Sequence, residues 1–500
     1  MLPNLLQRHQ IARQCEINRH QAGRYTFREN DLELKCMSKY PGNPTTQHSL
    51  PAFRRLVTIA SPLYIELSLG IGAGLIGTTL AAHISDPAAA AYALSNHIAA
   101  MLFILFRIIG AGISVVITQN LGSGRREVAD RISRAVLAAA TWVGLACVLV
   151  ALLLATPLMH MMNAPANVLP LAVPFLMWLA PAILLDAWIA SMSSITRAHF
   201  HARDALVVAV IAHAMSLSLA IPLMFGAMGL PAMGLPGFAL ASIGGRLIAL
   251  WLCLRIWRTR LGLVPVARDW WQLKPRELGT VMKIGVPAAA ENIAYRFSFM
   301  VSVAVAGLLG TNALATQAYA LQISYIALMF GLALGFAVEI VVGHMIGAGH
   351  LHDAHRLVRR ALAWGLGLSV TATGISALVA PWTLRMFTDD AAIIASGTML
   401  LWLTVLLEPG RTFNLVIING LRAAGDVRYP VIAGAASMLV VLAGGSWLLG
   451  VYAGYGLTGL WIAYAADEWI RGLLMWRRWV KLGWVPHARD ARRRMRHSSQ

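Results

Sequence analysis

The stretch Lys283–Met300 reads KIGVPAAAENIAYRFSFM, and it has the length and apolar character of a helix that crosses a membrane. It nevertheless contains a carboxylate, Glu291, and a guanidinium, Arg296. A charged side chain at the centre of a bilayer costs about 2.5–3.5 kcal/mol on helix-insertion scales. Such charges persist where they pair with another group or perform a function, so Glu291 and Arg296 are the first candidates for a functional site.

A similar stretch lies 225 residues earlier in the chain. Residues 60–66 read ASPLYIE, which places Pro62 opposite Pro287 and Glu66 opposite Glu291. The same spacing relates LGSGR at 121–125 to IGAGH at 346–350, Arg131 to Arg356, Arg134 to Arg359, Arg197 to Arg422, Arg203 to Arg428 and Arg246 to Arg471. Chance would not keep one period over so many charged and glycine positions, so the chain is an internal duplication.

The composition is that of a polytopic helical membrane protein. Of the 500 residues, 58% are hydrophobic and only 13% are charged, whereas soluble domains carry about 25% charged residues. Apolar runs of about 20 residues predict twelve spans, near 55–80, 90–118, 134–158, 169–195, 205–226, 236–257, 284–309, 315–343, 360–384, 393–420, 430–450 and 456–477. Six spans in each half give both halves one orientation, so we expect an axis of pseudo-symmetry along the membrane normal.

The net charge of +19 reflects the sidedness of the membrane rather than nucleic-acid binding. Most of the 41 Lys and Arg residues fall in segments on one predicted side, and the opposite loops carry only Arg385. This asymmetry follows the positive-inside rule, and it predicts a bacterial inner-membrane protein with both termini in the cytoplasm. Anionic lipids are the expected partners of the basic side.

These observations divide the chain into five segments. Residues 1–54 are polar and predict a disordered cytoplasmic tail, for which Met37 is an alternative start. Two six-helix bundles are predicted at 55–257 and 284–480. The cytoplasmic linker at 258–283 carries a Trp pair, 270–271, suited to the membrane interface, and 481–500 is a basic cytoplasmic tail. The four cysteines suggest no disulfide framework, and we expect no signal peptide before the first span.

Motifs for catalysis or cofactor binding are missing from the sequence. It contains no G-x-x-x-x-G-K-[ST] and no H-E-x-x-H pattern, so we expect neither an enzyme nor a bound cofactor. The glycines at 121–125 and 346–350 suit turns between spans. His350, His352, Asp353 and His355 could ligate a metal, but the matching segment of the first half lacks histidines, and no metal site is predicted.

Charges within the predicted spans are the informative residues. The acids are Glu66, Asp186, Glu291 and Glu408, and the bases are Arg107, Arg296 and Arg411. Seven unpaired charges would cost about 20 kcal/mol, so they must form ion pairs or line a wet cavity. Burial favours a protonated carboxyl and a nearby arginine favours the charged form, so an acid with both neighbours can bind and release a proton or a cation. Glu66 and Glu291 are favoured because they occupy equivalent positions.

The doubled P-x-x-x-E pattern, the G-x-G loops and the stretch LRAAGD at 421–426 resemble the multidrug and toxic compound extrusion (MATE) family over residues 55 to 480. This resemblance implies twelve helices in two six-helix bundles around a V-shaped cavity. It also implies the export of organic compounds in exchange for H⁺ or Na⁺, by a monomer that alternates its access.

The sequence departs from the family pattern at its cation-binding positions. Gly77 stands where many members carry an Asp in the first helix, Tyr295 replaces an acid of the seventh helix, and Arg411 replaces an Asp of the tenth. The family's site is therefore not carried over whole. Coupling candidates are Glu66 and Glu291, together with Asp186 on the basis of its burial; candidates for the substrate cavity are Arg107, Tyr295, Arg296, Glu408 and Arg411.

Several functions remain open beside a MATE-type antiporter for drugs. Arg296 and Arg411 would favour anionic aromatic metabolites such as flavins if they face the cavity unpaired, whereas pairing with Glu291 and Glu408 would favour cationic drugs. A flippase for lipid-linked glycans is a further alternative, which twelve rather than fourteen spans argue against. A lipid-modifying membrane enzyme would need a catalytic cluster, and a channel would conduct without an ion gradient.

Overall fold

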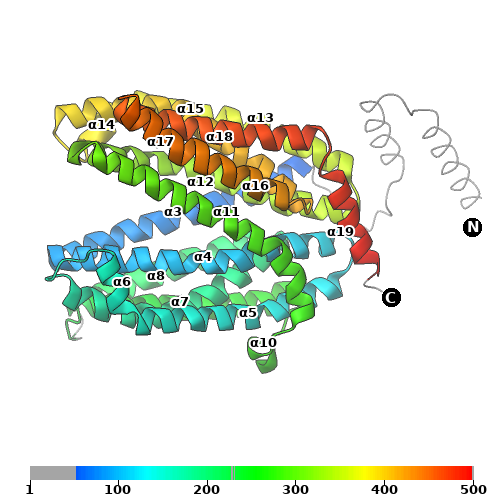
Figure 1. Ribbon diagram of the computed structural model, residues 1–500. Coiled ribbons are helices and arrows are strands. Elements are labelled where there is room, and N and C mark those ends of the chain that lie inside the picture. The colour runs from blue at the N-terminus through cyan, green and yellow to red at the C-terminus, as the bar shows by residue number, and fades with distance from the viewer. Residues whose placement is uncertain (1–51, 227–228, 230, 498–500) are drawn as a thin grey trace, which may run out of the picture.

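The computed structural model describes residues 52–226, 229 and 231–497, and these form helices without a single strand (Figure 1). Nearly all of the predicted tail at 1–54 lies outside the described residues. The N-half consists of α3 (Ala52–Ala82), α4 (Asp86–Gly122), α5 (Arg126–Leu153), the short α6 (Ala155–Met161), α7 (Leu169–Ala198), α8 (Ala202–Phe225) and α9 (Leu235–Ile256). These give the first six predicted spans.

The C-half repeats this order. It consists of α11 (Pro275–Leu308), α12 (Thr311–Ala348), α13 (Leu351–Leu378), the short α14 (Ala380–Arg385), α15 (Ala391–Ala423) and α18 (Gly456–Val480). Its fifth span is composite, with α16 (Arg428–Ser437), the π-helical turns η3 (Met438–Gly444) and η4 (Leu448–Tyr452), and α17 (Gly445–Trp447) between them. Glycines at 444, 445 and 450 accompany the wide turns.

Nine of the described spans are long and apolar enough to cross a membrane by composition alone. The other three are α4, α11 and α18, whose repeat mates α12, α3 and α9 all qualify. Because repeat mates occupy equivalent places, all twelve spans belong to one polytopic membrane fold with two lobes of six helices.

The segments outside the two lobes are also helical. The predicted linker at 258–283 contains most of η2 (Trp257–Leu261), α10 (Ala267–Trp271) and the first turns of α11. Its two tryptophans pack on the N-half, with Trp271 against Trp142 and Trp270 against Trp188. The predicted basic tail at 481–500 contains α19 (Val485–His497).

Local signals in the sequence explain where several helices begin and end. The Ser85 hydroxyl accepts a hydrogen bond from the Ala88 amide and caps α4, and the Asp390 carboxylate caps α15 in the same way. Gly226 ends α8 and Gly349 ends α12, both with a positive φ that side chains with a Cβ rarely adopt.

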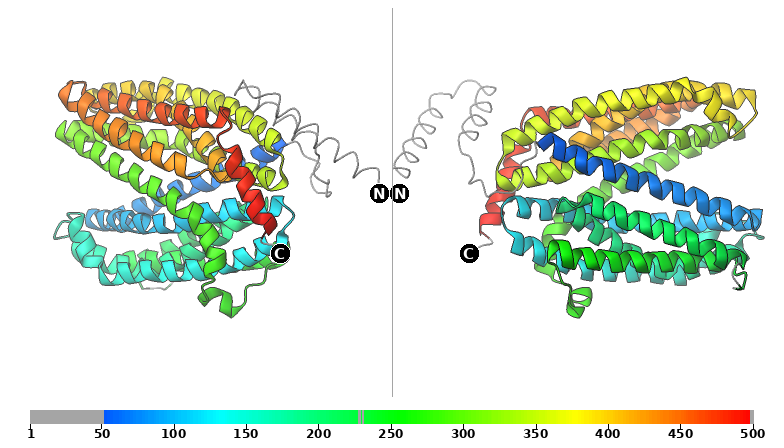
Figure 2. Two further views of the ribbon diagram at one scale, coloured as in Figure 1. Left: turned by 45° about the vertical axis from the view of Figure 1, so that its right-hand side comes forward. Right: turned by 180° about the vertical axis from the view of Figure 1, so that it is seen from behind.

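The first helix of each half begins in the opposite lobe. Leu56 and Ile59 of α3 are buried in the core of the C-half, whereas Val281 of α11 is buried in the core of the N-half. Leu56 and Val281 are repeat mates, so the two crossovers are equivalent. Figures 1 and 2 show α3 and α11 passing between the lobes, and this exchange interlocks the halves.

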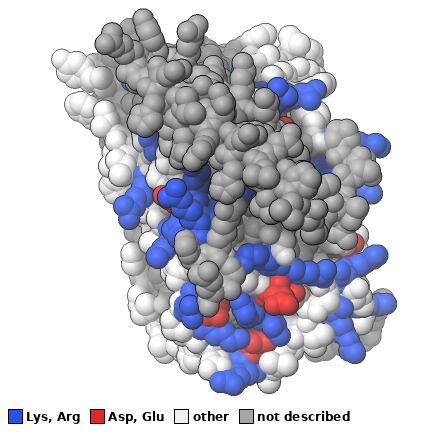
Figure 3. Space-filling view, turned by 90° about the vertical axis from the view of Figure 1, so that its right-hand side faces the viewer, with Lys and Arg blue, Asp and Glu red and all other residues white. Residues whose placement is uncertain are grey.

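The lobes meet most closely at the end that carries α19 and the loops at 123–125 and 349–350, called the basic end below. Lys and Arg side chains gather on this end, with few Asp and Glu among them (Figure 3). Here α4 crosses α12 through glycines: a Cβ added to Gly122 would lie 2.1 Å from the His344 carbonyl oxygen, and one on Gly347 would lie 2.1 Å from that of Gln119. Small residues let the two backbones touch, as helices in lipid require for tight packing.

Candidate functional site: a cavity between the halves and a buried charge network

A cavity of about 470 Å³ lies between the two halves. Helices of the N-half form most of its wall, and α11, α12 and α15 of the C-half complete it. The wall carries the carboxylates Glu66, Asp186 and Glu339, the guanidinium groups Arg197, Arg246 and Arg422, and the imidazole of His213. A polar cavity shared by two repeat-related lobes can hold a solute and be exposed by movement of either lobe.

Two equivalent ion pairs border this cavity. Glu66 of α3 accepts a hydrogen bond from Arg197 of α7 at 2.8 Å. Their repeat mates form the second pair, in which Arg422 of α15 donates to Glu291 of α11 at 2.6 Å. The Glu66–Arg197 pair is partly exposed and the Glu291–Arg422 pair is mostly buried. Each pair thus ties the first helix of a half to the end of its fourth spanning helix.

The two halves differ at a second pair of equivalent positions. In the N-half, Asp186 of α7 pairs with Arg246 of α9 at 2.8 Å, and both line the cavity. The repeat mates of these residues are Arg411 and Arg471, two arginines. Two buried guanidinium groups require counter-charges, and the C-half supplies them from other positions.

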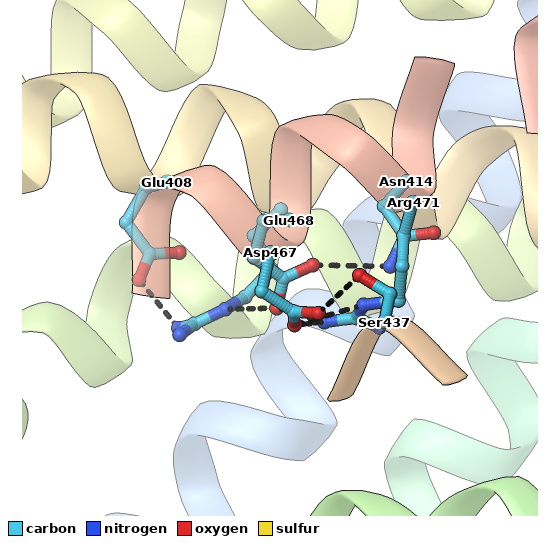
Figure 4. Close-up of polar contacts among 7 residues, drawn as sticks. Glu408, Asn414, Ser437, Asp467, Glu468 and Arg471 are labelled. Carbon is cyan, nitrogen blue, oxygen red and sulfur yellow. Dashed lines mark hydrogen bonds and ion pairs between the residues drawn. The ribbon is translucent and has the colours of Figure 1, made fainter. Parts of the chain in front are cut away.

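Three carboxyl groups surround those two arginines and form the network that we call the C-half charge network: Glu408, Arg411, Asp467, Glu468 and Arg471 (Figure 4). Arg411 contacts Glu408 at 2.5 Å and Glu468 at 3.2 Å. Arg471 contacts Asp467 at 2.6 Å and Glu468 at 2.9 Å. Asn414 and Ser437 donate to Glu468 and Asp467 respectively. All five charged side chains are buried.

The network holds one carboxyl group more than its guanidinium groups can neutralise. One oxygen of Glu408, Oε2, is buried and receives no hydrogen bond among the described residues. A buried carboxylate without a partner is costly, and a proton or a small cation on this group would remove both the charge excess and the missing bond. The arrangement can therefore take up one positive charge.

The predicted site residues are divided between the wall of the cavity and the C-half charge network. Glu66, Asp186 and the Glu291 partner Arg422 are on the cavity wall. Tyr295, Glu408 and Arg411 do not belong to its described wall; Glu408 and Arg411 lie in the C-half charge network, and Tyr295 stacks on Phe299 beside it. The side chain of Arg107 lies outside the described part of the chain.

Arg296 has surroundings unlike those of the other predicted bases. Its side chain is exposed, and it makes no ion pair within residues 52–226, 229 and 231–497. It lies four residues after Asn292, which lines the cavity, so both side chains occupy the same face of α11. Glu291, one of its possible partners, is held by Arg422 instead.

Three members of the network were missing from the predicted set of intramembrane charges. Asp467, Glu468 and Arg471 all lie in the last predicted span, and their presence in an apolar run was a usable signal. Arg197, Arg246, Arg422 and Arg471 enter the sequence analysis only as positions of the repeat. Within the described residues, no group of three or more His, Cys, Asp or Glu side chains is placed to hold a metal ion.

Two interlocked lobes of six helices around a polar cavity define a polytopic membrane transporter, and comparisons with known proteins agree. The MatE family model matches residues 62–225 and 287–447. The uncharacterized transporter YisQ of Bacillus subtilis is 31% identical over 430 residues, which cover 86% of this chain and 94% of that protein. Multidrug resistance protein PmpM of Pseudomonas aeruginosa is 23% identical over 407 residues, 81% of this chain and 83% of its own length.

A solved structure shares the fold. The MATE transporter VcmN of Vibrio cholerae in its bent form superposes with a TM-score of 0.78 at 18% identity, over 88% of this chain and 98% of that one. The chain belongs to the MATE family of transporters, and it is not an enzyme.

Proposed function

We propose that the chain is a secondary active exporter of organic compounds, which exchanges its substrate for H⁺ or Na⁺ by alternating access. The observation that carries this proposal is the cavity between two repeat-related lobes, bordered by two equivalent Glu–Arg pairs. Rocking of the lobes about the crossovers of α3 and α11 would open this cavity to each side in turn. The name of PmpM, a multidrug resistance protein, supports drugs as one class of substrate.

The membrane orientation in this proposal places the basic end in the cytoplasm of a bacterium. The Lys and Arg residues at that end support it through the positive-inside rule. The cavity would then release its substrate toward the far end, which carries α6 and α14. Anionic lipids would surround the basic end.

In this proposal, the coupling ion acts by neutralising a carboxylate that holds an arginine in an ion pair. Protonation of Glu66 or Glu291 would leave Arg197 or Arg422 without its counter-charge, and either helix end could then move. Asp186 stands in the same relation to Arg246. The C-half charge network supplies a further uptake site, because its excess carboxyl group admits one proton or one Na⁺.

A second candidate substrate class is favoured by Arg296. Its guanidinium is exposed one helical turn from the cavity-lining Asn292, and this positive charge would favour anionic aromatic compounds over cationic ones. The buried Arg411, in contrast, is neutralised by Glu408 and Glu468 and would not attract an anion.

Purified protein in proteoliposomes, with H⁺ and Na⁺ gradients imposed separately, tests the proposed function. Efflux of a fluorescent drug that follows one gradient, saturates with substrate and stops when the gradient is collapsed is the expected result. Flux that is unsaturable and indifferent to both gradients would show a channel instead.

A further inference from the structure

Two hydrogen bonds cross between the halves at the basic end, and they are equivalent under the repeat. The side-chain amide of Gln119, on α4, donates from Nε2 to the carbonyl oxygen of Ala423 at 2.8 Å. His344, on α12, contacts the carbonyl oxygen of Ala198 through Nε2, also at 2.8 Å. Gln119 and His344 are 225 residues apart, as are Ala198 and Ala423. One cross-lobe contact therefore occurs twice.

The acceptors of these bonds are the last residues of α7 and α15. Carbonyl groups in the last turn of a helix have no partner within that helix, so a donor from elsewhere satisfies them. In each case the donor comes from the other half of the molecule. Ring stacking on Phe200, at 4.1 Å between centroids, holds the His344 imidazole in place.

Each acceptor directly follows the arginine of a Glu–Arg pair. Ala198 follows Arg197, which Glu66 holds, and Ala423 follows Arg422, which Glu291 holds. A displacement of Arg197 or Arg422 would therefore move the adjacent carbonyl oxygen away from its donor. The cross-lobe bonds and the charged pairs share the same two helix ends.

The same donors border the closest approach of the two backbones. The Gln119 and His344 carbonyl oxygens are the atoms that a Cβ on Gly347 or Gly122 would strike at 2.1 Å. A Cβ on Gly343 would likewise lie 2.1 Å from the Thr118 hydroxyl oxygen. Backbone packing and both polar contacts thus coincide in one patch at the basic end.

We propose that the hydrogen bonds of Gln119 and His344 form a double latch that keeps the basic end closed, and that the Glu66–Arg197 and Glu291–Arg422 pairs hold this latch in its closed state. The proposal rests on the alternating access of the proposed function. The latch closes when the pairs hold the ends of α7 and α15 against the donors of the opposite half. Neutralising either glutamate frees an arginine, shifts the helix end and opens that side of the cavity.

Side-selective labelling tests the latch without substrate or ion gradient. Cys15, Cys36, Cys147 and Cys253 are first replaced by Ser, and Ser194→Cys then places one thiol on the cavity wall. A membrane-impermeant maleimide is applied to right-side-out and to inverted vesicles. Gln119→Leu and His344→Leu remove the donors at similar side-chain volume, and Gly347→Ala separates the backbones.

We expect each of these changes to raise labelling from the basic side about two- to tenfold, the population shift that the loss of one hydrogen bond produces. Labelling from the far side should fall correspondingly. Gly374→Ala is the matched control, because a Cβ at this helical position of α13 meets no atom within 4 Å. Labelling that stays at the control level in all three variants would overturn the proposal.

A cross-link covers the case in which a latch variant does not fold. The Cβ atoms of Thr118 and an added Cβ on Gly343 would be 2.9 Å apart, so Thr118→Cys with Gly343→Cys needs only a small shift to form a disulfide. The oxidised protein should keep far-side labelling and lose basic-side labelling, and reduction should restore it. Unchanged basic-side labelling in the oxidised form would also contradict the latch. A protein that responds as expected but exports nothing would retain the latch and refute the proposed function.

Discussion

At the scale of single residues, the Glu–Arg pairs combine two roles that a substitution can separate. Removing one partner of a buried ion pair leaves the other charge uncompensated and costs about 3–5 kcal/mol, whereas removing both partners is often tolerated. Glu291 and Arg422 are the more buried of the two equivalent pairs. Stability and transport should therefore respond differently to single and double substitutions.

Glu291→Gln is expected to abolish gradient-driven export and to lower the thermal stability of the purified protein, because Arg422 loses its counter-charge. Adding Arg422→Gln should recover much of the stability but none of the export. Efflux assays and thermal unfolding in detergent measure both effects. Asp353→Asn, on an exposed carboxylate beside His350, is the control. Normal efflux by Glu291→Gln would contradict the assignment.

Arg296 provides a second test at this scale. A guanidinium attracts an anion at about 4 Å by roughly 4 kcal/mol at an effective dielectric near 20, before desolvation is counted. Arg296→Ala is therefore expected to reduce uptake of an anionic fluorophore into inverted vesicles more than uptake of a cationic one. Arg385→Ala, at the far end of the molecule, is the matched exposed control. Equal effects on both fluorophores would dispose of an anionic preference.

The repeat predicts which residues belong to a functional site, but it does not predict which of them contact each other. Glu66 and Arg197 are 131 residues apart, and so are Glu291 and Arg422, so no local pattern relates them. The seven predicted charges also omitted Asp467 and Glu468, although both lie within the last predicted span. Which charged residues form ion pairs depends on how the helices pack against one another, and the spacing of residues within one helix does not determine that packing.

At the scale of elements, α19 makes packing contacts that the charge pattern of the sequence does not predict. The sequence of 481–500 predicts a basic tail, and the structure packs Val485, Ala488, Ala491 and Met495 of α19 against the protein. Trp484 stacks on Trp479 at 4.5 Å, and Arg125 of the N-half donates to the Met495 carbonyl oxygen. A helix attached to the C-half thus reaches the N-half (Figure 2).

Removal of residues 485–500 is expected to lower the melting temperature of the purified protein by several degrees, because it removes the packing of Val485 and Ala488 on the core of the C-half and the contact of Met495 with Arg125. Thermal unfolding followed by tryptophan fluorescence measures the change. A chain that lacks only residues 498–500 should melt like the full-length protein. Equal melting of both truncations would show that α19 contributes nothing to the assembly of the lobes.

At the scale of the whole molecule, topology was the most predictable property. Twelve apolar runs and a period of 225 residues predict two equivalent six-helix lobes, and the family and the fold confirm this. The crossing of α3 and α11 into the opposite lobes could not be predicted. Leu56 and Val281 are apolar in any arrangement, and only tertiary packing decides which core they enter.

The proposed orientation in the membrane rests on the distribution of charge and can be measured directly. In a cysteine-free chain, Val264→Cys in the exposed linker should react with an impermeant maleimide only from the cytoplasmic side. Asp389→Cys, exposed between α14 and α15, should react only from the opposite side. Reaction of the linker cysteine from the periplasm alone would invert the topology and with it the direction of transport.

Arg411 is the repeat mate of Asp186, and this difference in charge between the halves limits how such a chain can evolve. A chimera that joined two N-halves would keep both Glu–Arg pairs but lose the excess carboxyl group, and one that joined two C-halves would bury that excess twice. A homodimer of single halves faces the same restriction, since its subunits cannot differ. A single polypeptide is free of this restriction, because its two halves can differ in sequence while they share one scaffold.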